Sequence, residues 1–511
     1  MKRFFCLLTA VILLLTAGCG TPNYVFLEYD LTDAPGTLDP QFASTDTECL
    51  IAANLFEGLV RLASDGTISP ACAQDWEISD GGRTYTFALR DKIFWSDGSL
   101  VTADDFVFAF ERLFAPGAAS LHAESYSGIL GAREILAGEA QLSALGVSSP
   151  DERTLVIRLE EANASFLSLL AQTPAMPCSR AFFEEQKGRY GLSDGRLLTN
   201  GPFELYSWGS SRVRLCRAQH YGEPVSIDGV NLNLSQTDAA GRYLAGETSA
   251  CLFDGGSLPD GVKGELFYDR SWALLLNPAS EAFSDERLRA AVLGALTQQT
   301  LVHTAPSPAR PSEGLIPPAV TIGAVFYRET AGAPALPEYP DDPRQTMLDA
   351  FAALEIERFP KAELLVCKDE TGTAVGGAMQ SDWSTKLSAY FNMEPLALTE
   401  LTARVQNGAF EMALAPLSAQ GADETKGLAL FASLLKDGAA ELEALLQDVR
   451  RQSSPEAAAQ DLLLAEEAVL SEYLAVPVYD TPSLFACAQG IGGIWYEPAV
   501  RIVYFKDAVV S

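Results

Sequence analysis

The sequence predicts an α/β fold, because strand-like runs alternate with helix-like runs along its whole length. Residues 83–90 (RTYTFALR) place an aromatic or aliphatic side chain at every second position, which is the pattern of a half-buried strand. Residues 102–114 begin with a threonine and an aspartate at capping-box spacing, and Phe106, Phe110 and Leu113 then recur at helical spacing. Such a stripe is typical of a helix that faces the core.

The other elements are assigned in chain order from the same two periodicities. Residues 284–296 start with Ser284 as the helix cap and continue with acidic residues, which the helix dipole favours in a first turn. Leu288, Val292 and Leu296 form the buried side of this helix. A second helix is expected at residues 457–473, and further strands at 24–29, 154–160, 362–369 and 409–417.

A proline-rich stretch, residues 304–343, interrupts the alternation. Proline has no backbone N–H and a fixed φ, so the stretch can be neither a regular helix nor a central strand. From its composition it is either a linker between domains or a long ordered excursion over the surface.

The composition is that of a folded and strongly acidic protein. The 511 residues are 48% hydrophobic and 20% charged, which suffices for several domain-sized units with large cores. The 67 acidic residues outnumber the 36 basic ones and give a net charge of −31. A field of that sign repels phosphate backbones, so we expect no nucleic-acid partner. The acidic surface either serves solubility alone or also attracts cationic solutes.

The N-terminus has the three parts of an export signal. Lys2 and Arg3 are followed by an apolar run at residues 4–15 and by small residues before Cys19. This run is shorter than the roughly 20 residues that span a bilayer. We therefore expect residues 1–18 to be a signal peptide and the chain to have no membrane span.

The end of this signal resembles a bacterial lipobox, in which the cysteine thiol is lipidated and the chain is cut before it. The usual pattern has Leu three residues before the cysteine, whereas here Thr16 holds that place and Leu15 precedes it. We expect Cys19 to be the lipidation site, which anchors an extracytoplasmic protein to the cell membrane, at the cell surface or in the periplasm. Two or three acyl chains anchor stably where one does not. The alternative is ordinary secretion with an incidental cysteine.

The remaining sequence carries no reactive constellation. The seven cysteines after Cys19 have long, irregular spacings without CxxC, so we expect mostly buried free thiols and no metal site. Three histidines lie far apart, and the motifs HExxH, GxSxG, Walker A and a strand-following GxGxxG are absent. We therefore expect no catalytic residue, no cofactor and no enzymatic activity. An exported chain of this size without such residues suggests a binding protein.

Seven stretches of the mature chain carry a resemblance to a known family. They are residues 35–42 (PGTLDPQF), 54–113, 199–208 (TNGPFELYSW), 283–296, 314–318 (GLIPP), 406–419 (QNGAFEMALAPLSA) and 474–486 (LAVPVYDTPSLFA). Together they closely resemble bacterial extracellular solute-binding proteins of the oligopeptide/dipeptide family, which deliver cargo to ATP-driven (ABC) importers. The resemblance covers essentially the whole mature chain and is strong in its first hundred residues.

The resemblance implies a two-lobed, periplasmic-binding-protein-like clamshell of the α/β class with two interlobe crossing strands. Lobe I would comprise residues 19–273, with a subdomain at about 61–195, and the chain would return to it at 479–511. Lobe II would comprise residues 274–478, with the proline-rich stretch as a surface excursion inside it. Two crossing strands make a hinge on which the lobes can close over a ligand.

A segment of lobe II is implied to carry the ligand. In peptide-binding members, the segment that corresponds to residues 413–420 runs along the cleft and pairs with the main chain of the peptide. This implies ligand contacts at Ala415, Leu417, Ala419 and Gln420. Leu417 stands where the family usually has tryptophan, and Gln420 where it has an aspartate that holds the ligand's ammonium end. A neutral amide cannot make that charge-assisted bond, for which Asp423 is the alternative. The apolar residues suggest either a less charged ligand or simple filling of the core.

Four further ligand contacts are implied by position. Asn200 and Gly201 match a family segment near the cleft and could offer a side-chain amide and a close backbone approach. Trp495 and Tyr496, near the C-terminal return, would form aromatic walls. Each of the four has a purely structural role as its alternative.

The resemblance implies a lipid-anchored, extracytoplasmic substrate-binding protein that captures peptides or a related small solute by lobe closure. Its partners would be that ligand and the permease subunits of an ABC importer, and we expect a monomer. One alternative is that the same fold binds a non-peptide solute, such as a metal chelate or a sugar, or senses a signalling peptide. Another is a surface enzyme or structural lipoprotein on the same fold, which the missing catalytic cluster disfavours.

Overall fold

The computed structural model describes residues 24–511 except for 64–65, 118–119, 235–237, 255–257, 324, 419–424 and 436–437. The predicted signal peptide, the predicted lipidation site Cys19 and the predicted ligand contacts Ala419, Gln420 and Asp423 lie outside the described residues. Within the described part of the chain, no helix is both long and apolar enough to cross a bilayer.

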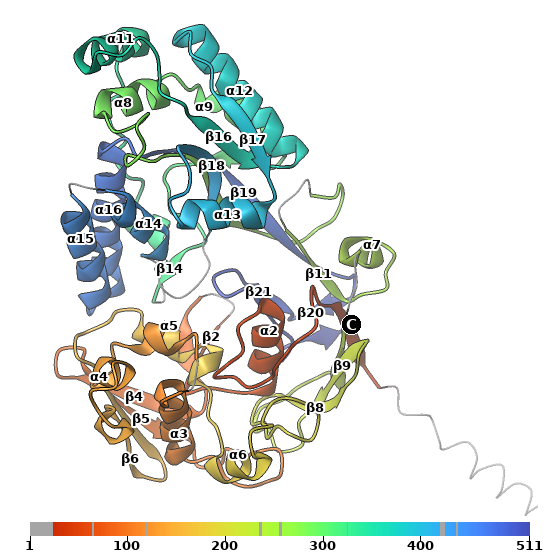
Figure 1. The fold of residues 1–511 in the computed structure, drawn as a ribbon. Coiled ribbons are helices and arrows are strands. Elements are labelled where there is room, and N and C mark those ends of the chain that lie inside the picture. The colour runs from red at the N-terminus through yellow and green to blue at the C-terminus, as the bar shows by residue number, and fades with distance from the viewer. Residues whose placement is uncertain are drawn as a thin grey trace, which may run out of the picture.

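Two lobes, one above the other in Figure 1, are joined by two long strands, β12 (Glu265–Leu276) and β19 (Ala475–Cys487). The first lobe holds the chain before β12 and the residues that follow β19, and the second lobe holds the chain between these strands. The arrangement confirms the predicted two-lobed α/β clamshell with two crossing strands.

The first lobe is built on two four-stranded sheets that share one hydrophobic core. The first sheet has, in order, β1 (Phe26–Asp30), β10 (Gly229–Asn233), β9 (Arg212–Arg217) and β8 (Phe203–Trp208), with only β1 and β10 parallel. The second sheet is antiparallel, in the order β4 (Ala73–Ser79), β5 (Thr84–Leu89), β7 (Thr154–Arg158) and β6 (Val147–Asp151). Strands β1, β5 and β7 confirm three of the strands predicted from alternation.

Helix α3 (Ala103–Phe114) packs against β6 and β7 of the second sheet. The backbone N–H of Thr102 donates to the carboxylate of Asp105 at 2.8 Å, which forms one half of the predicted capping box. Phe106 and Phe110 are fully buried, so the aromatic stripe belongs to the core as predicted.

Short elements complete the first lobe. Before β12 they are α2 (Asp46–Leu55), β2 (Val60–Leu62), β3 (Ile68–Pro70), η1 (Ala123–Tyr126), α4 (Ala132–Leu136), η2 (Leu142–Ala144), α5 (Phe166–Leu170), η3 (Thr173–Ala175), α6 (Arg180–Gln186), α7 (Ala239–Leu244) and β11 (Ala250–Phe253). After β19 they are β20 (Ile491–Gly492), β21 (Trp495–Glu497), β22 (Ile502–Tyr504) and β23 (Val509–Val510).

The second lobe is organised around a seven-stranded sheet that continues into the first lobe through β11. Its order is β11, β19, β12, β18 (Met412–Ser418), β16 (Glu363–Cys367) and β17 (Asn392–Leu396), with β13 (Arg310–Pro311) beside β19. Strands β16 and β18 confirm the strands predicted at 362–369 and 409–417. The side chains of β18 alternate between two hydrophobic clusters, so this sheet is buried on both faces.

Helices cover the two faces of this sheet. Those whose side chains join one cluster are α8 (Glu286–Gly294), α9 (Gln298–Thr304), α11 (Pro343–Leu354) and α12 (Glu370–Lys386). Those of the other cluster are α13 (Leu398–Gln406), α14 (Lys426–Leu434), α15 (Ala439–Arg451) and α16 (Pro455–Ser471). The same face of the sheet also carries β14 (Thr321–Ile322), β15 (Val325–Phe326) and α10 (Tyr327–Ala331), because Ile322 and Tyr327 belong to the cluster of α13 to α16. Helices α8 and α16 confirm the two helices predicted there.

Two details of the prediction are wrong. The cap of α8 is Asp285 and not Ser284, because the Asp285 carboxylate accepts the backbone N–H of Arg287 at 2.9 Å. The proline-rich stretch lies within the second lobe but is not only a surface excursion. Its residues Leu315 and Tyr327 are fully buried in the core of that lobe.

The ladder between β12 and β19 is interrupted where the chain passes between the lobes. Phe267 is the last paired residue of β12 on the side of the first lobe, and Arg270 is the first on the side of the second lobe. Tyr268, Asp269 and Pro482 lie between these pairs, and a proline has no N–H to continue a ladder. We propose that the lobes join here, earlier along β12 than the predicted boundary after residue 273 and later along β19 than the boundary after 478.

Candidate functional site

Strand β18 presents a partly free backbone edge at the end that points toward the junction of the lobes. Its whole length pairs with β12, from Leu276 opposite Met412 to Arg270 opposite Ser418. On its other side, pairing with β16 within the described residues is limited to Met412 and Ala413. The main-chain groups of β18 beyond Ala413 are therefore positioned to pair with an extended ligand, except that Pro416 offers no N–H.

The side chains of this strand are directed into the core of the second lobe. Ala415 is 1% and Leu417 8% exposed, and both belong to the cluster that α14 to α16 cover. These fractions include the main chain, so the backbone of Ala415 is covered as well in this arrangement. Their burial favours core filling for the side chains, while their role as ligand contacts stays a prediction.

A group of charged and hydroxyl side chains gathers where the crossing strands leave the second lobe. We call it the crossing cluster, and its members are Asp254, Asp269, Arg270, Ser483, Tyr496 and Arg501. They come from β12, β19, β21, the residue after β11 and the turn between β21 and β22. The cluster therefore joins four separate parts of the chain at the junction of the lobes.

Asp254 holds both arginines of the crossing cluster. One of its oxygens lies 2.5 Å from Nη1 of Arg270 and the other lies 2.5 Å from Nη2 of Arg501. Arg501 also pairs with Asp46 at the start of α2, at 2.8 Å. Burial alone would raise the pKa of the Asp254 carboxyl, but the two guanidinium groups lower it below its ordinary value.

Asp269 has a different environment, although it lies in the same cluster. Its Oδ2 accepts the hydroxyl of Ser483 at 2.8 Å, and the carboxylate is 4% exposed. Its Oδ1 has no hydrogen-bond partner within the described residues. Burial raises the pKa of this carboxyl and outweighs the opposing effects of Arg270 and Ser483, while the neighbouring charge of Asp254 adds to the increase.

The two predicted aromatic residues of β21 differ in their surroundings. Trp495 stacks on Tyr504 with 4.3 Å between the ring centroids. Tyr496 is 3% exposed and packs between Phe267 and Phe485, which belong to the two crossing strands. Its hydroxyl has no hydrogen-bond partner in the described part of the chain. The structure thus brings Tyr496 to the crossing cluster, and the roles of both residues as ligand walls stay predictions.

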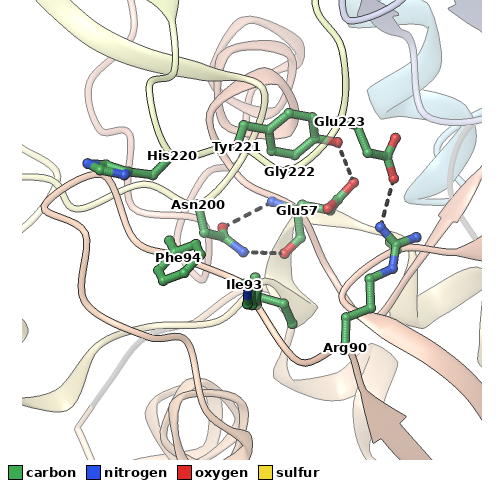
Figure 2. Close-up of a pocket in the computed structure, with 11 residues that line it drawn as sticks. Glu57, Arg90, Ile93, Phe94, Asn200, His220, Tyr221, Gly222 and Glu223 are labelled. Atoms are coloured by element: carbon green, nitrogen blue, oxygen red, sulfur yellow. Dashed lines mark hydrogen bonds and ion pairs between the residues drawn. The ribbon is translucent and has the colours of Figure 1, made fainter.

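Asn200 and Gly201 lie against the end of α2, deep in the first lobe. The Asn200 amide accepts the backbone N–H of Glu57 at 3.1 Å and donates to the Glu57 carbonyl at 2.9 Å, as Figure 2 shows. A side chain at Gly201 would come within 2.7 Å of the backbone of Leu55 and Phe56. These contacts support a structural role for Asn200 and Gly201. Their predicted role as ligand contacts stays a prediction.

The same region contains a small cavity of about 30 Å³, the size of one water molecule. Glu57 and Glu223 line it, together with Arg90, Tyr221 and His220 (Figure 2). The Glu57 carboxylate accepts the Tyr221 hydroxyl at 2.8 Å. The cavity is lined mainly by the segments that follow β5 and β9, and it is too small for a solute.

Glu223 is the centre of an ion-pair network beside this cavity. It accepts hydrogen bonds from Arg61 at 2.9 Å and from Arg90 at 2.8 Å, and Lys506 lies 2.8 Å from its other oxygen. Burial would raise the pKa of the Glu223 carboxyl, but these cations lower it to about 2. Arg90 directly follows β5 of the second sheet, and Lys506 lies in the C-terminal return. The ion pairs of Glu223 therefore connect two distant segments of the chain within the first lobe.

The lobes also touch at the edge far from the crossing strands. Arg451 at the end of α15 pairs with Glu161 of the first lobe at 2.6 Å. The Ser168 hydroxyl donates to the backbone carbonyl of Gly323 at 3.1 Å. Beside these contacts lies a cavity of about 400 Å³, lined by residues of the first lobe and by Gln447, Arg450 and Arg451 of α15. Its position between the lobes makes it part of the interlobe space.

Sequence reasoning missed Asp269 and Arg270 as candidate site residues. A signal was present, because these two charged residues interrupt the run FYDRSWALLL inside an otherwise hydrophobic strand. A charge pair in such a strand needs buried partners, and those partners, Asp254, Ser483 and Arg501, are distant in the sequence.

The comparisons with known proteins agree with this architecture. The family profile described as bacterial extracellular solute-binding proteins, family 5, middle region, matches residues 67–438. The probable deoxycholate-binding periplasmic protein YgiS of Escherichia coli is 28% identical over 528 residues, covering 96% of this chain and 94% of YgiS. The periplasmic oligopeptide-binding protein OppA of Escherichia coli is 36% identical over 188 residues, covering 36% of this chain and 34% of OppA.

Solved structures show the same fold. The Escherichia coli murein tripeptide binding protein MppA has a TM-score of 0.69 and 22% identity, with 96% of this chain and 99% of MppA covered. Haemophilus influenzae OppA in complex with the peptide RPPGFSPFR has a TM-score of 0.71 and 20% identity, with 96% and 99% covered. Because the family profile matches well over half of the chain, and the fold agrees over nearly all of it, the protein belongs to the bacterial extracellular solute-binding proteins of family 5.

Proposed function

We propose that this protein is the extracytoplasmic substrate-binding component of an ABC importer, and that it captures peptides or a related small solute between its two lobes. The observation that carries the proposal is the pair of crossing strands, β12 and β19, whose ladder is interrupted between the lobes. A two-stranded junction of this kind bends more easily than the sheets on either side of it. The relatives named as oligopeptide- and murein-peptide-binding proteins support the choice of peptides.

Peptide capture would use the free edge of β18. Main-chain pairing recognises an extended peptide without regard to its side chains, which suits a receptor for many sequences. Lobe closure would then remove the ligand from water and strengthen each polar contact made to it. The ligand can favour the closed state only to the extent that it binds that state more tightly.

The cellular setting of the proposal rests on the sequence. Lipidation of Cys19 would hold the protein at the outer face of the cell membrane, close to the permease subunits that receive the ligand. One folded chain with two lobes suffices for capture, so we propose a monomer. The family and the named relatives are binding proteins, and we propose that this chain likewise catalyses no reaction.

A second candidate is a non-peptide solute. It is favoured by YgiS, a relative named for deoxycholate that matches this chain over nearly its whole length. Gln420 in place of the aspartate expected from the resemblance points the same way. A pheromone receptor, PrgZ, shares the fold with a TM-score of 0.70, which is compatible with the signalling-peptide alternative but shows the fold alone.

Thermal unfolding with candidate ligands tests the proposal. A ligand at a hundredfold excess over its Kd stabilises the folded state by about 2.7 kcal/mol, which shifts the unfolding temperature by several degrees. We expect such shifts with short peptides and none with nucleotides as a control. Mass spectrometry of ligand retained by gently purified protein identifies the solute directly. No shift across peptides of varied length and termini, together with a retained non-peptide solute, would favour the second candidate.

A further inference from the structure

We propose that one face of the first lobe rests on the surface of the lipid bilayer that holds the anchor, through an aromatic row made of Phe26, Arg214 and Tyr206. The inference rests on the proposed lipidation of Cys19 and adds a second contact with the same membrane. At the surface of a bilayer, aromatic rings lie among the lipid headgroups, and an arginine binds phosphate oxygens.

The aromatic row crosses the outer face of the first sheet, from β1 to β8. Phe26 pairs with Gly229 of β10, and its ring covers that glycine, because a Cβ there would come within 2.6 Å of the ring. The guanidinium of Arg214 on β9 lies 5.5 Å from the centre of the Phe26 ring and 6.0 Å from that of Tyr206. One arginine therefore lies between two aromatic rings on the same face of the sheet.

This row belongs to the surface of the first lobe and not to its core. Leu27, the next residue of β1, is buried in that core, whereas Phe26 is only partly buried and lies outside it. Tyr206 is 66% exposed. It falls at a bulge, where the register with β9 shifts between Leu205 and Ser207. Because a bulge redirects the side chain of its extra residue, the Tyr206 ring projects from the sheet.

The position of the proposed anchor places the bilayer near this row. Four residues separate Cys19 from Tyr24, where the described chain begins, so the Cα atoms of these two residues are at most about 18 Å apart. Tyr24 is exposed and precedes Phe26 by two residues. The acyl chains on Cys19 would therefore enter the membrane within one short tether of the end of β1 that carries the row.

The local charge also suits a lipid surface. The protein has a net charge of −31, so most of its surface is repelled by anionic headgroups. Arg214 is different, because it donates its Nε–H to the side-chain oxygen of Asn231 at 2.9 Å and has no carboxylate partner among the described side chains. Its neighbour Arg212, in contrast, pairs with Glu28 at 3.6 Å. The row thus offers a positive charge that a lipid phosphate can neutralise.

The tether makes a weak contact sufficient. A short flexible linker holds two groups at an effective concentration of the order of 1 mM. A contact with a Kd of about 1 mM would leave an untethered protein in solution, but it would be formed for about half of the time or more once Cys19 is anchored. Strands β8 and β9 lie on the side of the first lobe away from α15 and α16 (Figure 1), so this docking leaves the second lobe free to move.

Hydroxyl-radical footprinting read by mass spectrometry tests the inference, because it reports the exposure of single aromatic side chains. The lipidated protein on vesicles of phosphatidylcholine and phosphatidylglycerol is compared with the unlipidated mature chain, Cys19→Ser, mixed with the same vesicles. Tyr390 of the second lobe, 71% exposed, serves as the control within each molecule. Flotation of the vesicles and the mass of the N-terminal peptide establish whether Cys19 carries acyl chains.

We expect Phe26 and Tyr206 to be oxidised about threefold more slowly in the lipidated protein, which corresponds to docking for about two thirds of the time, with Tyr390 unchanged. Arg214→Glu should remove this protection, because it places a negative charge against the phosphates. Arg344→Glu, the same change at an exposed arginine of α11, should keep it. Each variant is compared with its own Cys19→Ser form, which cancels any local effect of the substitution on the reactivity of the rings.

Equal oxidation of the row in acylated and unacylated protein would overturn the inference and leave both the lipid anchor and solute capture standing. So would protection that survives Arg214→Glu, protection that Arg344→Glu removes equally, or protection of Tyr390 as strong as that of Tyr206. Absence of acyl chains on Cys19 would overturn the anchor and this inference together.

Discussion

Asp254 and Asp269 share the hydroxyl of Ser483 but differ in their cationic partners. The hydroxyl lies 2.8 Å from Oδ2 of Asp269 and 3.4 Å from Oδ1 of Asp254. Asp254 binds two arginines, whereas Asp269 has one oxygen without a partner among the described residues. The pKa of the first carboxyl is lowered, because its charge is compensated by direct ion pairs, and that of the second is raised, because burial outweighs the more distant effect of Arg270 and Arg501.

Removing the compensated charge should destabilise the fold. Asp254→Asn leaves Arg270 and Arg501, both 14% exposed at their side chains, without their shared partner. Breaking a partly buried pair in this way costs about 2 to 3 kcal/mol of the free energy of unfolding. Urea unfolding at pH 7 measures the loss. Lys361→Gln, which removes an ion pair whose lysine is 80% exposed, serves as the control and should change stability by less than about 0.5 kcal/mol. Similar values for the two variants would contradict the expectation.

The Glu223 network should make stability depend on pH in a defined window. The folded pKa of Glu223 is about 2, below the ordinary value of 4.5, so its stabilisation is fully present above about pH 4.5 and is lost as the pH falls toward 2. Glu223→Gln should lower the free energy of unfolding by about 2 to 3 kcal/mol at pH 7. The difference in the free energy of unfolding between wild type and Glu223→Gln should become smaller between pH 4.5 and pH 3. Urea unfolding of both proteins at several pH values measures this difference. A difference that stays constant with pH would contradict the claim that the ion pairs of Glu223 stabilise the fold.

Asn200 should act on stability and not on ligand binding. Asn200→Ala leaves the buried N–H of Glu57 without its partner and its C=O with only the thiol of Cys72 as a donor, at a cost of about 1 to 3 kcal/mol. Gly201→Ala should cost at least as much, because its Cβ would lie 2.7 Å from the backbone of Leu55. Thermal unfolding and calorimetry on the same samples separate the two effects. A folded Asn200→Ala that loses ligand affinity would instead support the sequence-based prediction that Asn200 contacts the ligand.

The ion pair between Glu161 and Arg451 should favour the closed arrangement slightly. Both side chains are about half exposed, at 52% and 50%, so the pair is worth at most about 1 kcal/mol. Glu161→Arg should weaken ligand affinity by up to about fivefold, and adding Arg451→Glu should restore it, because the swapped charges again attract. Calorimetry at low salt measures the three affinities. A double variant no better than Glu161→Arg would show that the pair does not form between the lobes in solution.

Periodicity in the sequence predicted several helices and strands, because their buried side chains recur at helical or strand spacing. Strand β5 and helix α3 follow their patterns closely, with Phe87 and Phe106 fully buried. The cap of α8 was missed by one residue, since Ser284 and Asp285 are both good caps and only geometry selects between them.

Contacts between distant residues were beyond prediction. The proline-rich stretch enters the core because buried Glu466 accepts the backbone N–H groups of Leu315 and Ile316 and the hydroxyl of Tyr327. Nothing in local composition reveals such a partner. The junction that we propose between the lobes could not be placed from the sequence for the same reason. Its position depends on how β12 pairs with β19, and both strands read as continuous in the sequence.

The candidate site was predicted at the level of segments rather than of side chains. Residues 413–418 and Tyr496 lie toward the junction of the lobes, but the side chains of Ala415 and Leu417 point into the core. The family resemblance implies a backbone edge as the ligand site, and that role stays a prediction. It cannot locate Asp269, whose hydrogen-bond partner Ser483 is distant in the sequence.

Small-angle X-ray scattering with and without saturating ligand tests most directly the claim that the two lobes close on a captured solute. The ligand is the peptide, or failing that the retained solute, whose binding calorimetry has established. We predict that the radius of gyration and the maximum dimension both decrease on binding, because the lobes rotate about the interruption between Phe267 and Arg270. Scattering curves that coincide within error, at ligand concentrations that saturate the protein, would contradict capture by lobe closure.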